Sequence, residues 1–311
     1  MSKIIVFGGS GFIGSHVADE LTRANHDVTI FDRNSSSYLK ENQKMILGDL
    51  NDVDLVTKAI EGKEVVYNFA ALSDLNDAME KPIEAIKNNI LGNCHILEGC
   101  KTNSIKRFIY ASSVYANSRE GGFYGLTKKS AESYVEEYQR HYDLDFTILR
   151  YGSLYGPRSD KHNGLRKIIS TAVSHKELKY IGNKDSVREY IHVQDAAIAS
   201  VQALNKKYKN KKIILTGHQP IKIIDLLNML AEIMDYSKDT ITFLDENYDG
   251  HYIQTPYHYD SDLALKYVPD SYVDFGEGLI ELIKDCEENK KKIILVTKYY
   301  DQIKKNKINK I

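Results

Sequence analysis

The sequence has few cysteines, no long apolar run and no excess of one charge. Its three cysteines, Cys94, Cys100 and Cys286, include no CxxC pair and cannot all pair with one another, which favours free thiols in a reducing compartment. No apolar stretch approaches the roughly 18 residues that a membrane-spanning helix needs. The first residues, MSKIIVFGG, begin a strand pattern and lack the features of a signal sequence. We therefore expect a cytoplasmic protein with no membrane partner.

The charge balance argues against nucleic acid as a partner. The chain carries 42 basic and 43 acidic side chains, for a formal net charge of −1. A nucleic-acid-binding protein is expected to present a basic excess. A chain of 311 residues can bury a sizeable core. We expect one large domain or two smaller lobes, and a small molecule as the partner.

Apolar runs alternate with helical patterns through the first half of the chain. Continuous apolar runs are typical of parallel strands whose two faces are both covered by helices. This half therefore predicts an α/β fold with a doubly wound parallel sheet of the Rossmann type. The expected strands are 3–8, 28–32, 45–49, 64–70, 107–112 and 146–151, and the expected helices are 12–23, 83–101 and 124–142.

The second half has a looser pattern, which predicts a smaller C-terminal α/β lobe that binds substrate over the strand ends. We expect a strand at 212–216 and helices from 194, over 223–234 and from 276. We assign 1–152 to the dinucleotide-binding domain, with a returning segment at about 187–217, and 153–186 and 218–311 to the substrate lobe. The lysine-rich tail from 291 is expected to be solvated or partly disordered, with an anion-binding arm as the alternative.

A glycine-rich loop marks the expected cofactor site. Gly8, Gly11 and Gly14 follow the first strand and open the first helix. The first glycine permits a tight turn, the second lets the backbone approach a pyrophosphate, and the third allows close helix–strand packing. The helix N-terminus adds unpaired N–H groups that favour an anion. This context predicts a dinucleotide site.

Acidic residues follow the second and third strands. Asp32 lies 18 residues after Gly14, where a carboxylate can accept the ribose hydroxyls of NAD and repel the 2′-phosphate of NADP. Arg33 argues the other way, because it could pair with that phosphate. Asp49 after the third strand either meets the adenine or caps a turn or helix. We expect NAD as the cofactor.

A tyrosine and a lysine stand one turn apart on the helix expected over 124–142. Positions 124, 128, 131, 135, 138 and 142 form one stripe, on which Lys128 is the charge. A buried ammonium costs free energy unless it is paired. Either Lys128 extends outward to water, or it lowers the pKa of Tyr124. With a positive nicotinamide ring, a downward shift of about three units would make Tyr124 a proton acceptor near neutral pH.

Eight motifs in order carry a resemblance to a known family. The chain resembles the extended short-chain dehydrogenase/reductases, the NAD-dependent sugar-nucleotide epimerases and dehydratases. The resemblance covers about residues 3 to 200. The motifs are GGSGFIG, GDL, NFAA (68–71), NNILG (88–92), YASSVY (110–115), YGLTK (124–128), LRYGSLYGPR (149–158) and VREYIHVQDAA (187–197).

By this resemblance Tyr124 is the catalytic base, Lys128 binds the nicotinamide ribose, and Ser113 hydrogen-bonds the sugar oxygen. Ser112 could exchange roles with Ser113, or either could be a strand-end hydroxyl without a role. Asn89 would support the cofactor site or be an ordinary buried helix asparagine. The cofactor set implied is Gly8, Gly11, Phe12, Ile13, Gly14, Asp32, Arg33, Asp49, Leu50, Ala70, Asn89, Tyr124, Lys128 and Tyr151; the substrate set is Ser112, Ser113, Ser153, Arg158 and Arg188.

The sugar-nucleotide pyrophosphate needs cationic donors from the second lobe. The resemblance assigns this role to Arg188, with an ion pair to Asp185 or Glu189 as the alternative. Arg158 is a second candidate, with loop solvation as its alternative. The chain also departs from the family pattern, because Ser153 replaces an asparagine and the Ser113–Tyr124 gap is only 11 residues. The segment HYIQTPYHY (251–259) stands where an arginine-containing stretch is expected. No metal site is expected.

These features lead to an NAD-dependent oxidoreductase that acts on a nucleotide-diphosphate sugar, most simply at C4. Val114-Tyr115 follows Ser113 in place of the Asp-Glu pair that dehydration requires. We expect a 4-dehydrogenase, and the resemblance extends to GDP-heptose-modifying enzymes of bacterial surface polysaccharide biosynthesis. The alternatives are a UDP-hexose-type 4-epimerase and a non-catalytic NAD-binding regulator or scaffold. A homo-dimer or homo-tetramer is expected through the helices at 83–101 and 124–142.

Overall fold

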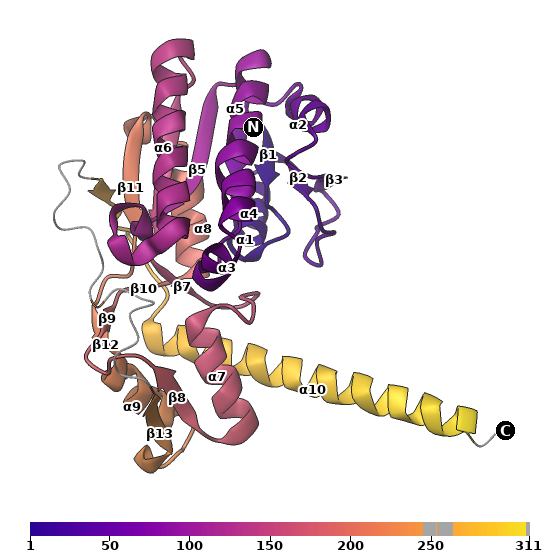
Figure 1. Cartoon of the computed structure of the whole chain (residues 1–311), viewed down its shortest axis with the longest axis vertical. Helices are drawn as coiled ribbons and strands as arrows, with labels where there is room; N and C mark the ends of the chain where they lie inside the picture. The colour runs from indigo at the N-terminus through magenta and orange to yellow at the C-terminus, as the bar shows by residue number, and fades with distance from the viewer. Residues whose placement is uncertain (245–252, 254–263, 309–311) are drawn as a thin grey trace.

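The computed structural model describes residues 1–244, 253 and 264–308 (Figure 1). Its main sheet has eight strands in the order β14-β11-β6-β5-β4-β1-β2-β3, and every neighbouring pair is parallel. The order 3-2-1-4-5-6 within it is that of a dinucleotide-binding fold, which confirms the expected fold class. The strands are β1 (Lys3–Phe7), β2 (Asp27–Asp32), β3 (Lys44–Leu47), β4 (Val65–Asn68), β5 (Arg107–Ser113), β6 (Phe146–Tyr151), β11 (Lys211–Leu215) and β14 (Leu265–Lys266).

Helices cover both faces of this sheet, which explains why its strands are apolar throughout. Ile4 and Val6 of β1 pack under α1 (Phe12–Arg23) and α8 (Val193–Gln202). Ile5 and Phe7 point the other way, toward α2 (Val53–Ile60), α5 (Gly92–Thr102) and α6 (Gly122–Tyr142). Because successive strand residues face opposite sides, one apolar run supplies two cores. Burial of each such side chain stabilises the fold by about 1.5–3 kcal/mol.

A second lobe lies beyond the ends of the strands, as Figure 1 shows. Its core joins apolar side chains of three helices, including Leu165, Leu227 and Leu282. Short strand pairs connect it to the sheet. The elements are α7 (Gly164–His175), α9 (Ile223–Ile233) and α10 (Phe275–Ile308), with the pairs β7 (Ser153–Tyr155) and β10 (Tyr190–His192), β8 (Leu178–Ile181) and β13 (Ile241–Leu244), and β9 (Val187–Arg188) and β12 (Ile221–Lys222).

Two parts of the chain differ from the expected elements. The helix expected over 83–101 is divided into α4 (Pro82–Ile86), a π-helical turn (Lys87–Leu91) and α5, and it is preceded by α3 (Leu75–Glu80). A π-helical turn inserts an extra residue into the helix and is frequent at functional sites. In addition, β14 joins the main sheet, although it lies within the stretch that we assign to the substrate lobe.

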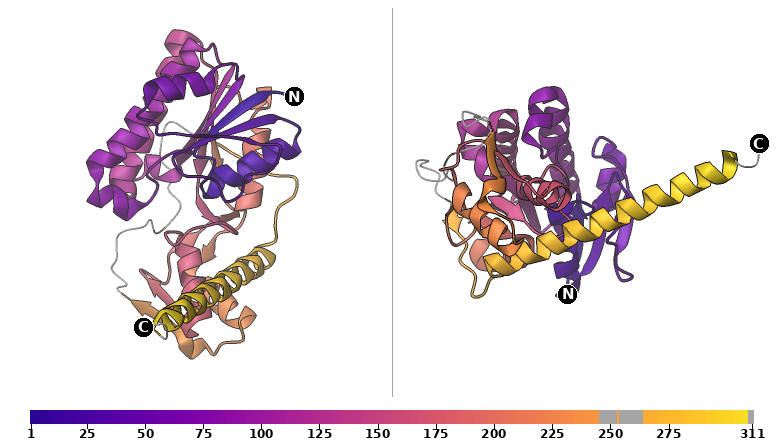
Figure 2. Two further views of the ribbon diagram at one scale, coloured as in Figure 1. Left: turned by 90° about the vertical axis from the view of Figure 1, so that its right-hand side faces the viewer. Right: turned by 90° about the horizontal axis from the view of Figure 1, so that it is seen from below.

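The C-terminal tail is helical where a solvated or partly disordered segment is expected. Helix α10 runs to Ile308 and extends away from both lobes (Figures 1 and 2). Its first turns are buried in the second lobe, and Lys290 Nζ donates to the Val173 carbonyl oxygen at 2.9 Å. Ile293 and the next three apolar residues are exposed. Of the helices in the described residues, none is both long and apolar enough to cross a bilayer.

Candidate active site

The glycine loop packs so closely against the segment after β4, and against itself, that no side chain fits at Gly8 or Gly14. Gly8 has φ +76, and a Cβ there would lie 2.5 Å from the Ala70 nitrogen. A Cβ on Gly14 would lie 2.2 Å from the Gly8 oxygen. Helix α1 begins at Phe12 after the N-cap residue Gly11, and no side chain caps it. Its first N–H groups are therefore available to an anion, which fits a dinucleotide pyrophosphate.

Asp32 lies beside this loop at the end of β2. Its Oδ2 accepts from the Ser10 N–H at 3.1 Å and its Oδ1 accepts from the Asn34 N–H at 3.0 Å. These two backbone bonds hold the carboxylate at the crevice, partly exposed, while Arg33 is exposed. The geometry fits a carboxylate that receives ribose hydroxyls.

Of the two cofactor candidates after β3, Asp49 lies in a turn and the side chain of Leu50 lies in the core. Asp49 accepts from the Asn51 N–H at 2.8 Å and from its side-chain amide at 2.6 Å, so the turn alternative describes its contacts. The Leu50 side chain is buried in the core and lies against Gly92. Its carbonyl oxygen is 2.7 Å from His95 Nδ1. Leu50 could therefore contribute to a ligand site only through its backbone.

Asn89 connects three parts of the site. Its side chain is buried within the π-helical turn, where its Oδ1 accepts from the Leu72 N–H at 2.7 Å. Its amide donates to the Leu72 carbonyl at 3.0 Å and to Thr127 Oγ1 at 2.9 Å. Since Leu72 follows the segment that touches Gly8, Asn89 joins the glycine-loop side of the crevice to α6. Asn89 is therefore a buried helix asparagine, and its support of the cofactor site stays a prediction.

Tyr124, Lys128 and Ser113 come together at the end of β5. Ser113 is the last residue of that strand, and its hydroxyl lies near the phenol of Tyr124, whose pKa it lowers. Lys128 is only 3% exposed. Its ammonium donates to the Ala111 carbonyl oxygen at 2.7 Å and lies 5.8 Å from the centroid of the Tyr124 ring. The alternative in which Lys128 extends outward to water is therefore wrong.

The electrostatics of the pair differ from the expectation. Burial raises the pKa of Tyr124 to about 12, and the hydrogen bond with Ser113 offsets part of that rise. Burial lowers the pKa of Lys128 to about 8, while the nearby carboxylate of Glu132 raises it. The groups of the chain therefore leave Tyr124 protonated at neutral pH. The expected downward shift of the Tyr124 pKa is not produced by Lys128 in this structure.

Ser112 does not face the site, which corrects one of the substrate assignments. Neighbouring strand residues point to opposite faces, and Ser112 is 3% exposed. Its hydroxyl donates to Glu132 Oε1. Glu132 also accepts from Arg150 Nε at 3.0 Å and Nη2 at 2.7 Å. This buried network beneath Lys128 was not expected from the sequence, although a carboxylate four residues after a buried lysine was a usable signal.

Two further expectations are corrected by buried contacts. The Tyr151 hydroxyl lies 2.6 Å from Ser200 Oγ in the core beneath α8, so its ring does not face the cofactor crevice. Arg158 Nη2 donates to Asp19 Oδ2 at 2.8 Å, and its guanidinium lies 4.4 Å from the Tyr38 ring centroid. Asp19 belongs to α1, well along the helix from the glycine loop. Arg158 therefore anchors the second lobe to α1 through Nη2, so loop solvation does not describe it, and its contact with substrate stays a prediction.

The assignments of Arg188 and Ser153 to the substrate site stay predictions. Arg188 is 6% exposed in β9, and its guanidinium donates to the Tyr180 hydroxyl at 3.4 Å. Ser153 begins β7, directly after the end of β6, and is partly exposed. The carboxylates that were alternatives for pairing with Arg188 contact lysines, Asp185 with Lys222 at 3.5 Å and Glu189 with Lys266 at 3.0 Å. The segment 251–259, apart from residue 253, lies outside the described residues.

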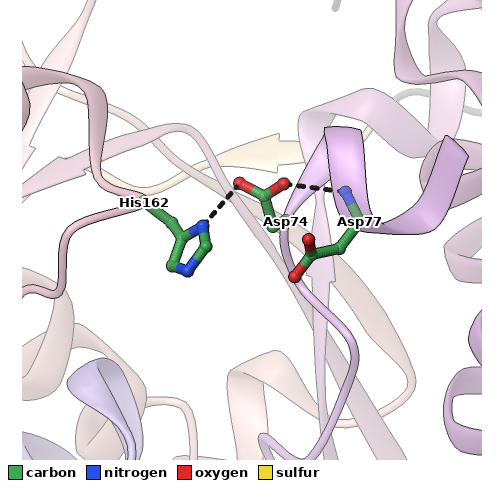
Figure 3. A group of neighbouring side chains, drawn as sticks. All are labelled: Asp74, Asp77 and His162. Carbon is green, nitrogen blue, oxygen red and sulfur yellow. Dashed lines mark hydrogen bonds and ion pairs between the residues drawn. The ribbon is translucent and has the colours of Figure 1, made fainter. Parts of the chain in front are cut away.

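Asp74, Asp77 and His162 form a cluster whose side-chain ligand atoms lie within 4.8 Å of one another (Figure 3). Asp74 Oδ1 accepts from the Asp77 N–H at 2.9 Å and so caps α3. Its Oδ2 lies 3.5 Å from His162 Nδ1. A helix cap and an ion pair between the two lobes account for this arrangement, and we infer no metal from it.

The comparisons with known proteins place the chain in a family. Residues 4–217 match the NAD dependent epimerase/dehydratase family. The match covers more than half of the chain, and the chain therefore belongs to this family. Members of this family are NAD-dependent enzymes that modify nucleotide sugars. The resemblance to this family that the sequence motifs indicated is therefore confirmed.

Individual relatives support the same class over nearly the whole chain. The chain is 28% identical to a Methanocaldococcus jannaschii protein described as a UDP-glucose 4-epimerase, covering 92% of this chain and 99% of the relative. It is similar to the Bacillus cereus UDP-glucuronic acid 4-epimerase solved with UDP-glucuronic acid and NAD, with 26% identity, a TM-score of 0.80 and coverage of 92% and 99%. The Thermotoga maritima UDP-glucose 4-epimerase solved with UDP-glucose gives 25% identity, a TM-score of 0.78 and the same coverage.

We expect the burial of Lys128 to give the protein a characteristic pH dependence. Its pKa falls from 10.5 to about 8 on folding, so the unfolded chain holds this proton more tightly between those values. Stability conferred by this group therefore rises as the pH increases from about 8 to 10.5. Relative to Lys128→Met, the free energy of unfolding of the wild type should increase by up to about 3 kcal/mol across that window.

Denaturant unfolding at pH 8, 9 and 10 measures this difference. Lys129→Met is the matched control, because Lys129 is the next residue of the same helix and is exposed. The Lys129 difference should stay flat with pH. A flat difference for Lys128→Met as well would mean that Lys128 is solvated in the folded protein.

Proposed function

We propose that the protein is an NAD-dependent nucleotide-sugar 4-epimerase that oxidises the C4 hydroxyl of a UDP-sugar and returns the hydride to the opposite face. The observation that carries this proposal is that Tyr124 and Ser113 lie together beside the buried Lys128. Parallel strands all end at the same edge of a sheet. The end of β5, which holds Ser113, is therefore two strands from the glycine loop that follows β1.

Each residue of this group has a role that its position permits. Tyr124 takes the proton of the sugar hydroxyl, and Ser113 holds the same oxygen by a hydrogen bond. Lys128 fixes the nicotinamide ribose and places a positive charge near the developing phenolate. Bound NAD supplies the hydride acceptor and a positive ring, which lowers the cost of ionising the phenol. Arg188 is our candidate to neutralise the substrate pyrophosphate.

The relatives favour epimerisation over the 4-dehydrogenase that we expect from the sequence. Three relatives reported above are 4-epimerases of UDP-sugars over at least 92% of this chain. This support makes UDP-sugars the first substrates to test. The GDP-heptose dehydrogenase is the less supported candidate. Dehydration is disfavoured, because Val114 and Tyr115 replace the acid pair that dehydration requires.

The test is a substrate panel with purified protein and NAD. We expect a C4-inverted product from at least one of UDP-glucose, UDP-glucuronic acid and UDP-N-acetylglucosamine, detected by chromatography or NMR. Steady accumulation of NADH at 340 nm, with a GDP-sugar included in the panel, would indicate the dehydrogenase. Binding of NAD with neither product from any sugar would contradict the proposal and favour the regulator or scaffold.

Tyr124→Phe should reduce kcat by at least about 10³-fold, because the variant keeps the ring but removes the proton acceptor. Affinity for NAD, measured by calorimetry, should change little. Tyr142→Phe is the matched control, since Tyr142 lies at the end of the same helix and is exposed. Equal turnover by Tyr124→Phe and Tyr142→Phe would remove Tyr124 from the reaction.

We also propose that the chain forms a homodimer through the face made by α3, α4 and α6. Helices α3 and α4 pack against α6. Several large apolar side chains on these helices are exposed. Exposed apolar side chains gathered on one face mark an interaction surface. They are Met79, Ile83 and Ile86 on α3 and α4, and Phe123, Leu126 and Tyr134 on α6.

Leu126→Lys should weaken this association roughly 100-fold, because the substitution would bury one unpaired ammonium from each subunit in an apolar interface. Light scattering at several protein concentrations measures the mass. Ile293→Lys on α10 is the control, since Ile293 is 66% exposed and Leu126 is 63% exposed. A monomeric wild type, or a dimer indifferent to Leu126→Lys, would contradict the proposed interface.

A further inference from the structure

A line of buried charges runs from Tyr124 along α6 to the sheet. Lys128, Glu132 and Arg150 are each 3% exposed. Tyr124, Lys128 and Glu132 follow at intervals of four residues, and Arg150 on β6 pairs with Glu132 from below. Along this line, a phenol that must ionise is followed by a cation, then an anion, then a second cation.

The Glu132 carboxylate is held in one orientation. Oε1 accepts from Arg150 Nε at 3.0 Å and from the Ser112 hydroxyl. Oε2 accepts from Arg150 Nη2 at 2.7 Å. A two-point contact with a guanidinium and a third bond from the adjacent strand leave the carboxylate little freedom to rotate. Glu132 is therefore a fixed negative charge one helical turn beyond Lys128.

Lys128 depends on its neighbours, because a buried ammonium loses its hydration. Its hydrogen bond to the Ala111 carbonyl oxygen, at 2.7 Å, and the face of the Tyr110 ring, with its centroid 5.0 Å away, replace part of the lost hydration. Neither of these carries a full negative charge. The carboxylate of Glu132 does, and it favours the charged form of Lys128.

We propose that Glu132 is a positioning residue that, fixed by Arg150 and Ser112, keeps the Lys128 ammonium charged and in place beneath Tyr124. The proposal rests on the proposed function for the roles of Tyr124 and Lys128. It adds a residue to the reaction that touches neither the substrate nor the cofactor. Its effect reaches the phenol only through Lys128.

The other titratable groups around Lys128 cannot supply this charge at neutral pH. Tyr110 on β5 and Cys94 on α5 have their pKa values raised by burial, so both stay neutral. Tyr124 is also neutral until it reacts, and Arg150 is a cation. Among these groups of the described chain, Glu132 is the anion. Its removal would leave Lys128 with Arg150 as a nearby like charge.

Glu132→Gln keeps the size of the side chain and removes its charge. The lost attraction favours loss of the Lys128 proton. Lys128 should therefore deprotonate at lower pH, by about one unit or more. If Lys128 must be charged for turnover, the alkaline limb of the kcat–pH profile should move down by the same amount, with roughly fivefold lower kcat at pH 8.

The direct test is an NMR titration of the full chain labelled with 13C at lysine Cε. The Lys128 resonance is the one missing from Lys128→Met, and in the wild type it should titrate near pH 8, well below the ordinary lysines near 10.4. Glu132→Gln should move that transition down. Glu136→Gln should not, because Glu136 is one turn further on, more exposed, and pairs with Lys212 at 3.0 Å.

A second variant guards against misfolding. Glu132→Gln removes a charged partner of the buried Arg150 guanidinium, which can destabilise the fold. The double variant Glu132→Gln/Arg150→Gln removes both charges, so the Lys128 transition should fall by less than in the single variant but still lie below that of the wild type. Ser112→Ala keeps the ion pair and should shift the transition least.

An unchanged Lys128 transition in folded Glu132→Gln, or in the double variant when the single one does not fold, would overturn the proposal. The titration needs neither substrate nor cofactor, so it separates this inference from the proposed function. Loss of turnover with an unchanged transition and an unchanged pH profile would assign Glu132 a merely structural role. A shifted transition in a protein that turns over no sugar would retain the electrostatic inference and reject the epimerase.

Discussion

The site depends on one constraint, which is that an ammonium group must remain charged inside a folded protein. Lys128 is 3% exposed, and burial alone lowers its pKa toward neutrality. The fold meets this constraint with a carbonyl from β5, two aromatic rings and the carboxylate of Glu132. Each of these groups comes from a different turn of α6 or from the neighbouring strand. The catalytic group therefore cannot be assembled unless α6 lies on the sheet in this one register.

The parallel sheet explains why the remaining parts of the site meet. The glycine loop after β1, Asp32 at the end of β2, the segment after β4 and Ser113 at the end of β5 all stand at the same edge, because parallel strands run in one direction. Asn89 then ties the segment after β4 to α6 through Leu72 and Thr127. The π-helical turn that holds Asn89 directs its side chain inward between these two segments. The cofactor side and the catalytic side are thus one connected structure.

The sequence predicted the parts of this arrangement that local patterns encode. Helix α1 was expected at 12–23 and is found there, and β6 was expected at 146–151 and is found there. Asp32 and Lys128 were found because each lies at a position fixed by a strand end or a helix repeat. Ser112 was misassigned, and the ion pair of Arg158 was not expected, because their partners, Glu132 and Asp19, are distant in sequence and only the folded chain brings them together. Glu132 was missed for the same reason, since its burial depends on Arg150 from β6.

The pair formed by Glu132 and Arg150 would be hard to explain by stability alone. Two buried charges lose their hydration, and an apolar pair of similar volume often stabilises a fold as well or better. Arg150 also lies opposite Ser112, one residue before the end of its strand, where an aliphatic residue would pack on the same core. What an apolar pair could not provide is a negative charge one turn from Lys128. A lysine in this position must be charged to stabilise a phenolate. The ion pair therefore has a chemical role at a place where apolar packing would be sufficient for stability alone.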